Sequence, residues 1–147
     1  MSNFYLKPYL GYNNITFNQT QEEVKKIDGI ATKIVVDNIM EETYEYRKAS
    51  VKLTYVEGKF VDIRIPQNPA GNQVFIFDFL KIDIFSNAAV DILKANFDYE
   101  ESQDKNRVLF PKLGICLWGF AKKTKEGKMV IAFSEERLSW YKTFLKA

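Results

Sequence analysis

The run EGKFV at residues 57–61 recurs almost half a chain later as EGKMV at residues 126–130. In both runs a glycine lies between two charged residues, and β-prone segments flank it, which is the pattern of a tight hairpin turn. The segment before the first turn reads VKLTY at residues 51–55, and its apolar and polar side chains alternate strictly. After the turn, Asp62 and Arg64 alternate with apolar residues. A period of two is typical of a strand with one buried face, so the sequence predicts an antiparallel hairpin here and a second one at the repeat.

Three segments carry the signals of short amphipathic helices, at residues 20–28, 86–95 and 134–146. The first opens with TQEE, the sequence of a capping box, and Ser86 and Ser134 are the expected N-caps of the other two. Together with the predicted strands, these segments indicate an α+β fold. We expect a largely antiparallel sheet with the helices packed on one face.

A turn-rich stretch, PQNPAGN at residues 66–72, is the best candidate for a boundary inside the chain. Helix and hairpin signals recur in the same order on its two sides. We therefore predict one compact unit made of two tandem αβββ-like repeats, residues 1–66 and residues 67–147, the second of which also carries the C-terminal helix. Chance recurrence is the alternative, because any α+β domain contains capped helices and glycine hairpins. The most apolar strand signal, VFIF at residues 74–77, predicts a central position in the sheet.

The helix that begins TQEEV, the preceding Ile15 and Phe17, and the later strand–EGK–strand hairpin together resemble one unit of a known group of repeat proteins. Each unit of that group combines a helical layer with a β-meander, and the group includes β-lactamase inhibitory protein and the small lipoproteins of the outer-membrane assembly machinery. The resemblance implies two such units in tandem and a role in binding another protein. The chain differs from the inhibitor in lacking disulfide-forming cysteine pairs, and from the lipoproteins in lacking a lipobox.

The chain has 147 residues, no histidine and one cysteine, Cys116. The lack of histidine removes the commonest general base at neutral pH and the commonest metal ligand. Cys116 lies in an apolar segment, where a buried inert thiol is expected, and a single cysteine indicates a reducing compartment. The sequence shows no secretory signal, and no run approaches the ~18 apolar residues of a membrane span. We therefore expect a cytoplasmic protein that is not an enzyme, with no catalytic residues, no cofactor, no metal and no contact with a membrane.

Two charged patterns have both a functional and a structural interpretation. Asp78 and Asp83 lie beside apolar residues and could form an acid–base pair, but a lysine lies between them, and solvent-facing strand positions are favoured. The basic run KKTK at residues 122–125 could bind nucleic acid with help from nearby aromatic residues. A solvated hairpin tip is favoured there, because a long hairpin needs charge to stay soluble. We therefore predict no nucleic-acid partner.

The surplus of aromatic residues points most directly to function. With 12 Phe, 8 Tyr and 2 Trp, the chain has more aromatic residues than a small core requires, and Tyr and Trp lead the energetics of protein interfaces. The predicted partner-binding residues are Tyr44, Tyr46, Tyr55 and Trp118, and the alternative is that they fill a core between sheet and helices.

Charge is unevenly distributed along the chain. From residue 111 to the end there are eight Lys or Arg against three Glu, which suits an acidic partner. We predict a non-catalytic protein-binding module, most concretely an immunity-type inhibitor that masks a bacterial toxin. The alternative is a small enzyme or ligand-binding domain whose site is not recognisable in the sequence.

Overall fold

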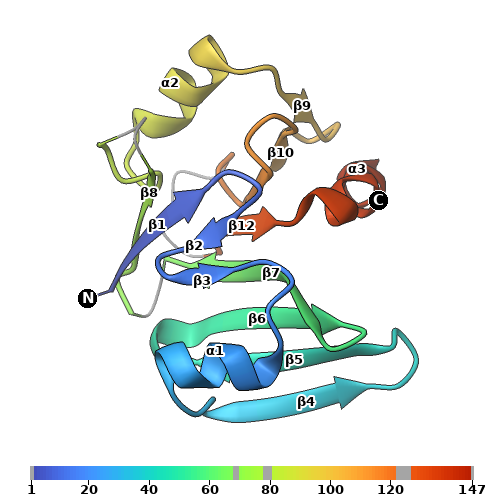
Figure 1. The fold of residues 1–147 in the computed structure, drawn as a ribbon. Helices are drawn as coiled ribbons and strands as arrows, with labels where there is room; N and C mark the ends of the chain where they lie inside the picture. The colour runs from blue at the N-terminus through green and yellow to red at the C-terminus, as the bar shows by residue number, and fades with distance from the viewer. Residues whose placement is uncertain (1, 68–69, 78–80, 122–126, 147) are drawn as a thin grey trace.

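The computed structural model describes residues 2–67, 70–77, 81–121 and 127–146. These residues form an α+β fold, as predicted, with three α-helices and twelve strands in two mostly antiparallel sheets. The large sheet has the strand order β4-β5-β6-β7-β12-β11-β10-β9, and the small sheet has the order β3-β2-β1-β8. Figure 1 shows the N-terminal strands on one side of the large sheet and α3 on the other.

The large sheet consists of two four-stranded meanders that lie side by side. The first contains β4 (Lys33–Asp37), β5 (Glu42–Arg47), β6 (Val51–Val56) and β7 (Lys59–Pro66), and a 3-10 turn, η1 (Lys48–Ser50), connects β5 to β6. The second contains β9 (Glu100–Glu101), β10 (Arg107–Phe110), β11 (Ile115–Trp118) and β12 (Met129–Phe133). The strands β7 and β12 join the two meanders as an antiparallel pair.

The first EGK run forms the hairpin turn that the sequence predicts. Glu57 and Gly58 connect β6 to β7, and both have positive φ, of 52° and 78°, as the commonest two-residue hairpin turn requires. At the second predicted turn, residues 122–126 lie outside the described residues, including the glutamate of the second EGK run. A helix precedes each meander, α1 (Gln21–Asp28) the first and α2 (Ala89–Asn96) the second. Duplication of the two halves, with a boundary between residues 66 and 67, stays a prediction.

The small sheet brings the beginning of the chain next to its middle. It contains the antiparallel strands β1 (Asn3–Lys7), β2 (Gly11–Tyr12) and β3 (Ile15–Thr16), and β8 (Gln73–Ile76) adds to β1 in parallel. The predicted central position of residues 74–77 is wrong, because β8 is an edge strand. A loop covers this edge: the Val74 amide donates to the Asp83 carboxylate at 2.9 Å, and the Ile84 amide donates to the Val74 carbonyl at 2.7 Å. The strand is apolar because Val74 and Ile76 are buried in the core.

The three helices lie where the sequence predicts them, but the second and third begin later than predicted. The predicted capping box of α1 is present, with the Thr20 hydroxyl accepting from the Glu23 amide at 3.2 Å and the Glu23 carboxylate accepting from the Thr20 amide at 3.1 Å. The second helix begins only at Ala89, because the Ser86 hydroxyl donates to a carbonyl in a preceding turn and does not cap. The third, α3 (Leu138–Lys146), follows a 3-10 turn, η2 (Glu135–Arg137), and the Ser134 side chain makes no capping hydrogen bond.

The large sheet has a layer on each of its two faces. Its inner face packs against the small sheet, α1 and α2, around residues such as Leu53, Ile63 and Leu93. On the outer face, Tyr141 and Leu145 of α3 pack on residues of β10, β11 and β12. The prediction that all helices pack on one face is therefore wrong. The reason lies in β12, which has apolar side chains on both faces of the sheet. The helix α3 follows β12 and can therefore turn back onto an apolar outer face.

Candidate binding face

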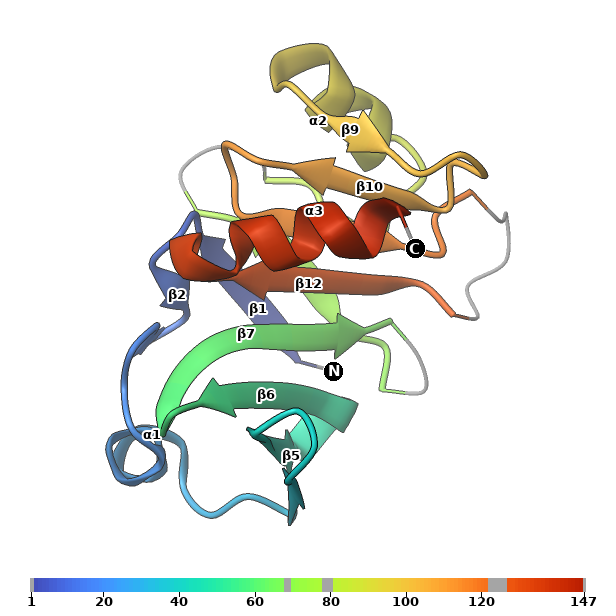
Figure 2. The ribbon, with the colours of Figure 1, turned by 90° about the vertical axis from the view of Figure 1, so that its right-hand side faces the viewer.

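The outer face of the large sheet is only partly covered by α3. Figure 2 views this face and shows α3 in front of the sheet between β10 and β12, while β5, β6 and β7 lie uncovered below it. We call the uncovered part the open face. Its accessible side chains are Lys33, Val35, Tyr44, Tyr46, Lys52 and Arg64, whereas Thr54 and Asp62 point to the same side of the sheet but are buried.

Strand register assigns these side chains to the outer face, because directly opposed residues of an antiparallel pair share a face. Arg64 lies opposite Ile131, and Ile131 packs under α3. From Arg64 the same row continues across the sheet to Lys52, Tyr46 and Lys33. The next row contains Val35, Tyr44, Thr54 and Asp62.

The first row is a strip of positive charge held partly out of water. Lys52 and Arg64 are half-buried. Among the described residues, no carboxylate lies within ion-pair distance of either side chain. The Nε of Arg64 is buried and has no hydrogen-bond partner in the described part of the chain. Burial, and then the nearby charge of Arg64, lower the pKa of Lys52.

Two half-buried tyrosines lie beside the lysines of the open face. The Lys52 ammonium is 4.4 Å from the ring centroid of Tyr44, and the Lys33 ammonium is 5.9 Å from that of Tyr46, within the range of cation–π attraction. The Tyr44 hydroxyl donates to Glu42 Oε1 at 3.0 Å. Burial, followed by this hydrogen bond, raises the pKa of Tyr44 to about 12. The open face therefore presents neutral aromatic rings fixed beside positive charges.

The buried carboxylates at the edge of the open face are engaged by α3 and the turn before it. Arg137 contacts Glu42 Oε2 at 3.2 Å and Asp62 Oδ2 at 3.1 Å, and the Tyr141 hydroxyl donates to Asp62 Oδ2 at 2.9 Å. Burial disfavours the charged guanidinium, but Asp62 and Glu42 outweigh it and raise the pKa of Arg137. The same guanidinium lies 4.7 Å from the ring centroid of Trp140, which borders the open face. Because both acids are held by Arg137, they do not form ion pairs with Lys52 or Arg64.

The structure separates the four predicted partner-binding residues. Tyr44 and Tyr46 lie together on the open face. Trp118 points to the same side of the sheet but packs against α3, with its ring centroid 5.8 Å from that of Phe144. Tyr55 is 1% exposed and points to the inner face, where its hydroxyl donates to Glu45 Oε1 at 2.7 Å. The expectation that Tyr55 contacts a partner is therefore corrected, because it is a core residue.

Sequence reasoning missed Lys52, Arg64 and Arg137. The signal for the first two was present, since both occupy polar positions of an alternating strand, but only the register places them opposite each other. For Arg137 there was no local signal, because its partners Glu42 and Asp62 lie 95 and 75 positions away.

The other candidate groups have structural roles or lie outside the described residues. Cys116 is fully buried, and burial raises the pKa of its thiol to about 12, which confirms the prediction of a buried thiol. The Asp83 carboxylate accepts from the amides of Val74 and Phe85 at 2.9 and 3.1 Å and so holds a loop against β8. Asp78 and the basic run at residues 122–125 lie outside the described residues.

Within the described part of the chain, no group of three or more His, Cys, Asp or Glu is placed to hold a metal ion. None of the described helices is long and apolar enough to cross a membrane. In comparisons with known proteins, no family model, no curated protein and no solved structure matches the chain. The resemblance to helix-plus-meander repeat proteins therefore stays a prediction.

Proposed function

We propose that the protein binds another protein stoichiometrically through the open face, as an immunity-type inhibitor that masks an acidic surface of a bacterial toxin. The row formed by Lys52, Arg64 and their neighbours carries this proposal. These cations are partly desolvated and have no carboxylate partner among the described residues. Partly buried charge without an ion-pair partner is unfavourable, so carboxylates of a partner would gain interaction energy that the free protein lacks.

The tyrosines give the same surface apolar contact area. Tyr and Arg are among the residues that most often dominate binding energy at protein interfaces. Tyr44 is already fixed by Lys52 on its face and by Glu42 at its hydroxyl, so it loses little side-chain entropy when a partner binds. Arg137 keeps Glu42 and Asp62 paired, which reduces their repulsion of an acidic partner.

Single-stranded nucleic acid is the other ligand that binds tyrosines beside lysines on a sheet. The cations of the open face form one short row across the sheet, whereas an extended polyanion needs a continuous positively charged groove, and for this reason we favour a protein with a localised acidic surface. The proposed setting is the bacterial cytoplasm, which agrees with a single buried cysteine.

Protection of cells is the test of this proposal. The protein is co-expressed in a bacterium with the toxin encoded next to its gene, and the wild type should restore growth. Tyr44→Ala/Tyr46→Ala should fail to protect while keeping the circular dichroism spectrum of the wild type. The matched control is Tyr5→Ala, which removes a tyrosine that is 44% exposed on the small sheet, and it should protect fully. Equal protection by the double variant, or the absence of any neighbouring toxin that the protein neutralises, would overturn the proposal.

A further inference from the structure

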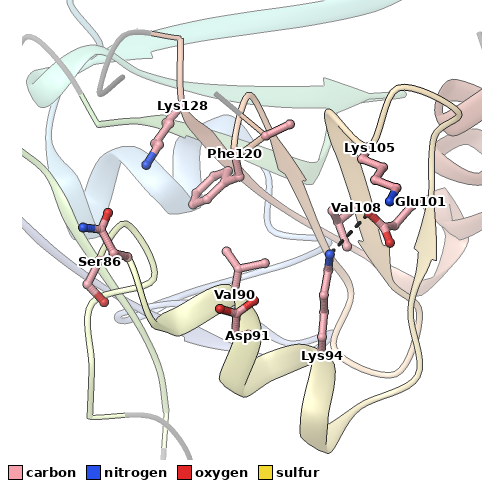
Figure 3. A pocket seen from close by; sticks show the side chains of 11 residues that line it. Ser86, Val90, Asp91, Lys94, Glu101, Lys105, Val108, Phe120 and Lys128 are labelled. Carbon is pink, nitrogen blue, oxygen red and sulfur yellow. Dashed lines mark ion pairs between the residues drawn. The ribbon is translucent and has the colours of Figure 1, made fainter. Parts of the chain in front are cut away.

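A cleft of about 580 Å³ lies between α2 and the edge of the large sheet. Figure 3 shows it from close by, with Val90 and Lys94 of α2 on one side and Phe120 and Lys128 on the other. Val108 of β10 also lines the cleft, and it belongs to the core of the inner face. The cleft therefore lies on the opposite side of the sheet from the open face, and its chemistry is independent of the proposed inhibitor function.

Lys128 is the unusual residue of this cleft. It is only 8% exposed. Its ammonium lies 5.4 Å from the ring centroid of Phe120 and is turned toward the space between Ser86 and Phe120, as Figure 3 shows. Among the described residues, no carboxylate lies within ion-pair distance of it. The stem of Lys128 is buried, but its ammonium opens onto the cleft without an ion-pair partner among the described residues, and an anion in the cleft would supply that partner.

The middle of the cleft is apolar. Phe120 is held by Phe85, whose ring stacks on it with centroids 5.8 Å apart and an angle of 8° between the rings. Val90 and Val108 complete the apolar surface. An apolar surface with a few fixed polar groups is the usual composition of a small-molecule site.

The charges at the far end of the cleft limit the ligand to a single negative charge. The Lys94 ammonium lies 3.3 Å from Glu101 Oε2, so these two groups largely neutralise each other. Asp91 and Lys105 also line the cleft and carry opposite charges, so the lining as a whole leaves one net positive charge. A phosphate dianion is therefore disfavoured, and a monocarboxylate matches the net charge of the cleft.

We propose that this cleft binds a small monocarboxylate with an apolar body. The carboxylate pairs with Lys128, and the apolar body packs on Phe120, Val90 and Val108. The ligand class thus combines one negative charge with an aromatic or short aliphatic group.

The test is a titration of the full chain with phenylacetate. Two-dimensional NMR of the backbone amides monitors binding. Saturable shifts are expected at Val90, Phe120 and Lys128. The neutral isostere phenylacetamide should bind at least about tenfold more weakly, because it cannot form the charge-assisted pair with Lys128. The Lys128→Met variant should bind phenylacetate at least about tenfold more weakly than the wild type does. The control Lys142→Met, which replaces an exposed lysine, should bind it like the wild type.

The comparison of acid and amide needs only the wild-type protein, so it decides the proposal even if Lys128→Met does not fold. Equal binding of the two compounds would overturn the proposal. The same holds if phenylacetate causes no saturable shift, or if the shifts map to the open face.

Discussion

Arg64 lies directly opposite Lys52 in the antiparallel pair of β7 and β6, and both side chains point to the open face. Like charges that oppose each other directly in a sheet are destabilising. Two such charges on a half-buried surface are difficult to explain as a requirement of the fold alone. An acidic partner would relieve the repulsion, which ties this pair to the proposed function.

Arg64→Met should raise the pKa of Lys52 toward its ordinary value of 10.5, since Arg64 is the nearby charge that lowers it in addition to burial. The measurement is an NMR titration of the lysine side-chain signals. Lys48→Met removes an exposed charge from the turn before β6 and should leave the pKa of Lys52 unchanged. An unaltered Lys52 pKa in Arg64→Met would show that the two side chains do not interact.

Arg137→Met should lower the free energy of unfolding by about 3–5 kcal/mol, because it leaves the fully buried Asp62 without its ion-pair partner. Urea denaturation measures the loss. Adding Asp62→Asn should recover part of it, so that the double variant is more stable than the sum of the two single effects predicts. As a matched surface pair, Lys112 and Asp98 are both largely exposed, and Lys112→Met should cost less than about 1 kcal/mol. Strict additivity of the two core substitutions would contradict the assigned ion pair.

Tyr55→Phe should destabilise the protein by about 1.5–3 kcal/mol, since it removes the hydrogen bond to the Glu45 carboxylate in the core. Tyr46→Phe is the control, because the Tyr46 hydroxyl has no hydrogen bond among the described residues, and its stability should stay within about 0.5 kcal/mol of the wild type. Thermal and urea unfolding of the two variants give the comparison. If both substitutions cost the same, the assignment of Tyr55 to the core and Tyr46 to the open face is wrong.

Stability should fall as the pH rises above 10. Burial raises the pKa of Tyr12, Tyr55 and Tyr141 in the folded state, whereas these groups ionise near pH 10 in the unfolded chain. Above pH 10 the unfolded state therefore binds fewer protons than the folded state. The stability contributed by each buried tyrosine is fully present below pH 10, and it is lost by up to about 1.4 kcal/mol per pH unit above it.

Urea denaturation at pH 8, 10 and 11, together with tyrosinate absorbance, measures this effect. The buried tyrosines should titrate only as the protein unfolds. Titration of all eight tyrosines near pH 10 in the folded protein would contradict the burial of these three.

The sequence predicted local features well and their spatial combination poorly. Alternation in residues 51–55 and 61–65, on the two sides of the first EGK run, identified the β6–β7 hairpin, and TQEE identified the start of α1, because these signals depend on neighbouring residues. Three features were not predictable in this way: the parallel pairing of β8 with β1, the return of α3 onto the outer face, and the pairing of Arg137 with Asp62. Each joins residues far apart in the chain.

The same limit applies to the candidate site. Composition singled out four aromatic residues, but Tyr55 differs from Tyr44 and Tyr46 only in which face of the sheet its strand position occupies. The cations Lys52 and Arg64 gained their significance only from the register.

The affinity between the purified protein and the toxin that it neutralises tests the central claim most directly. Isothermal titration should give a stoichiometric complex for the wild type. Lys52→Met/Arg64→Met should weaken it by at least about 100-fold, the loss expected from two charge-assisted contacts. The matched control Lys26→Met/Lys48→Met removes two exposed charges away from the open face and should bind like the wild type. Unchanged affinity of the Lys52→Met/Arg64→Met variant, with its fold intact, would contradict the account.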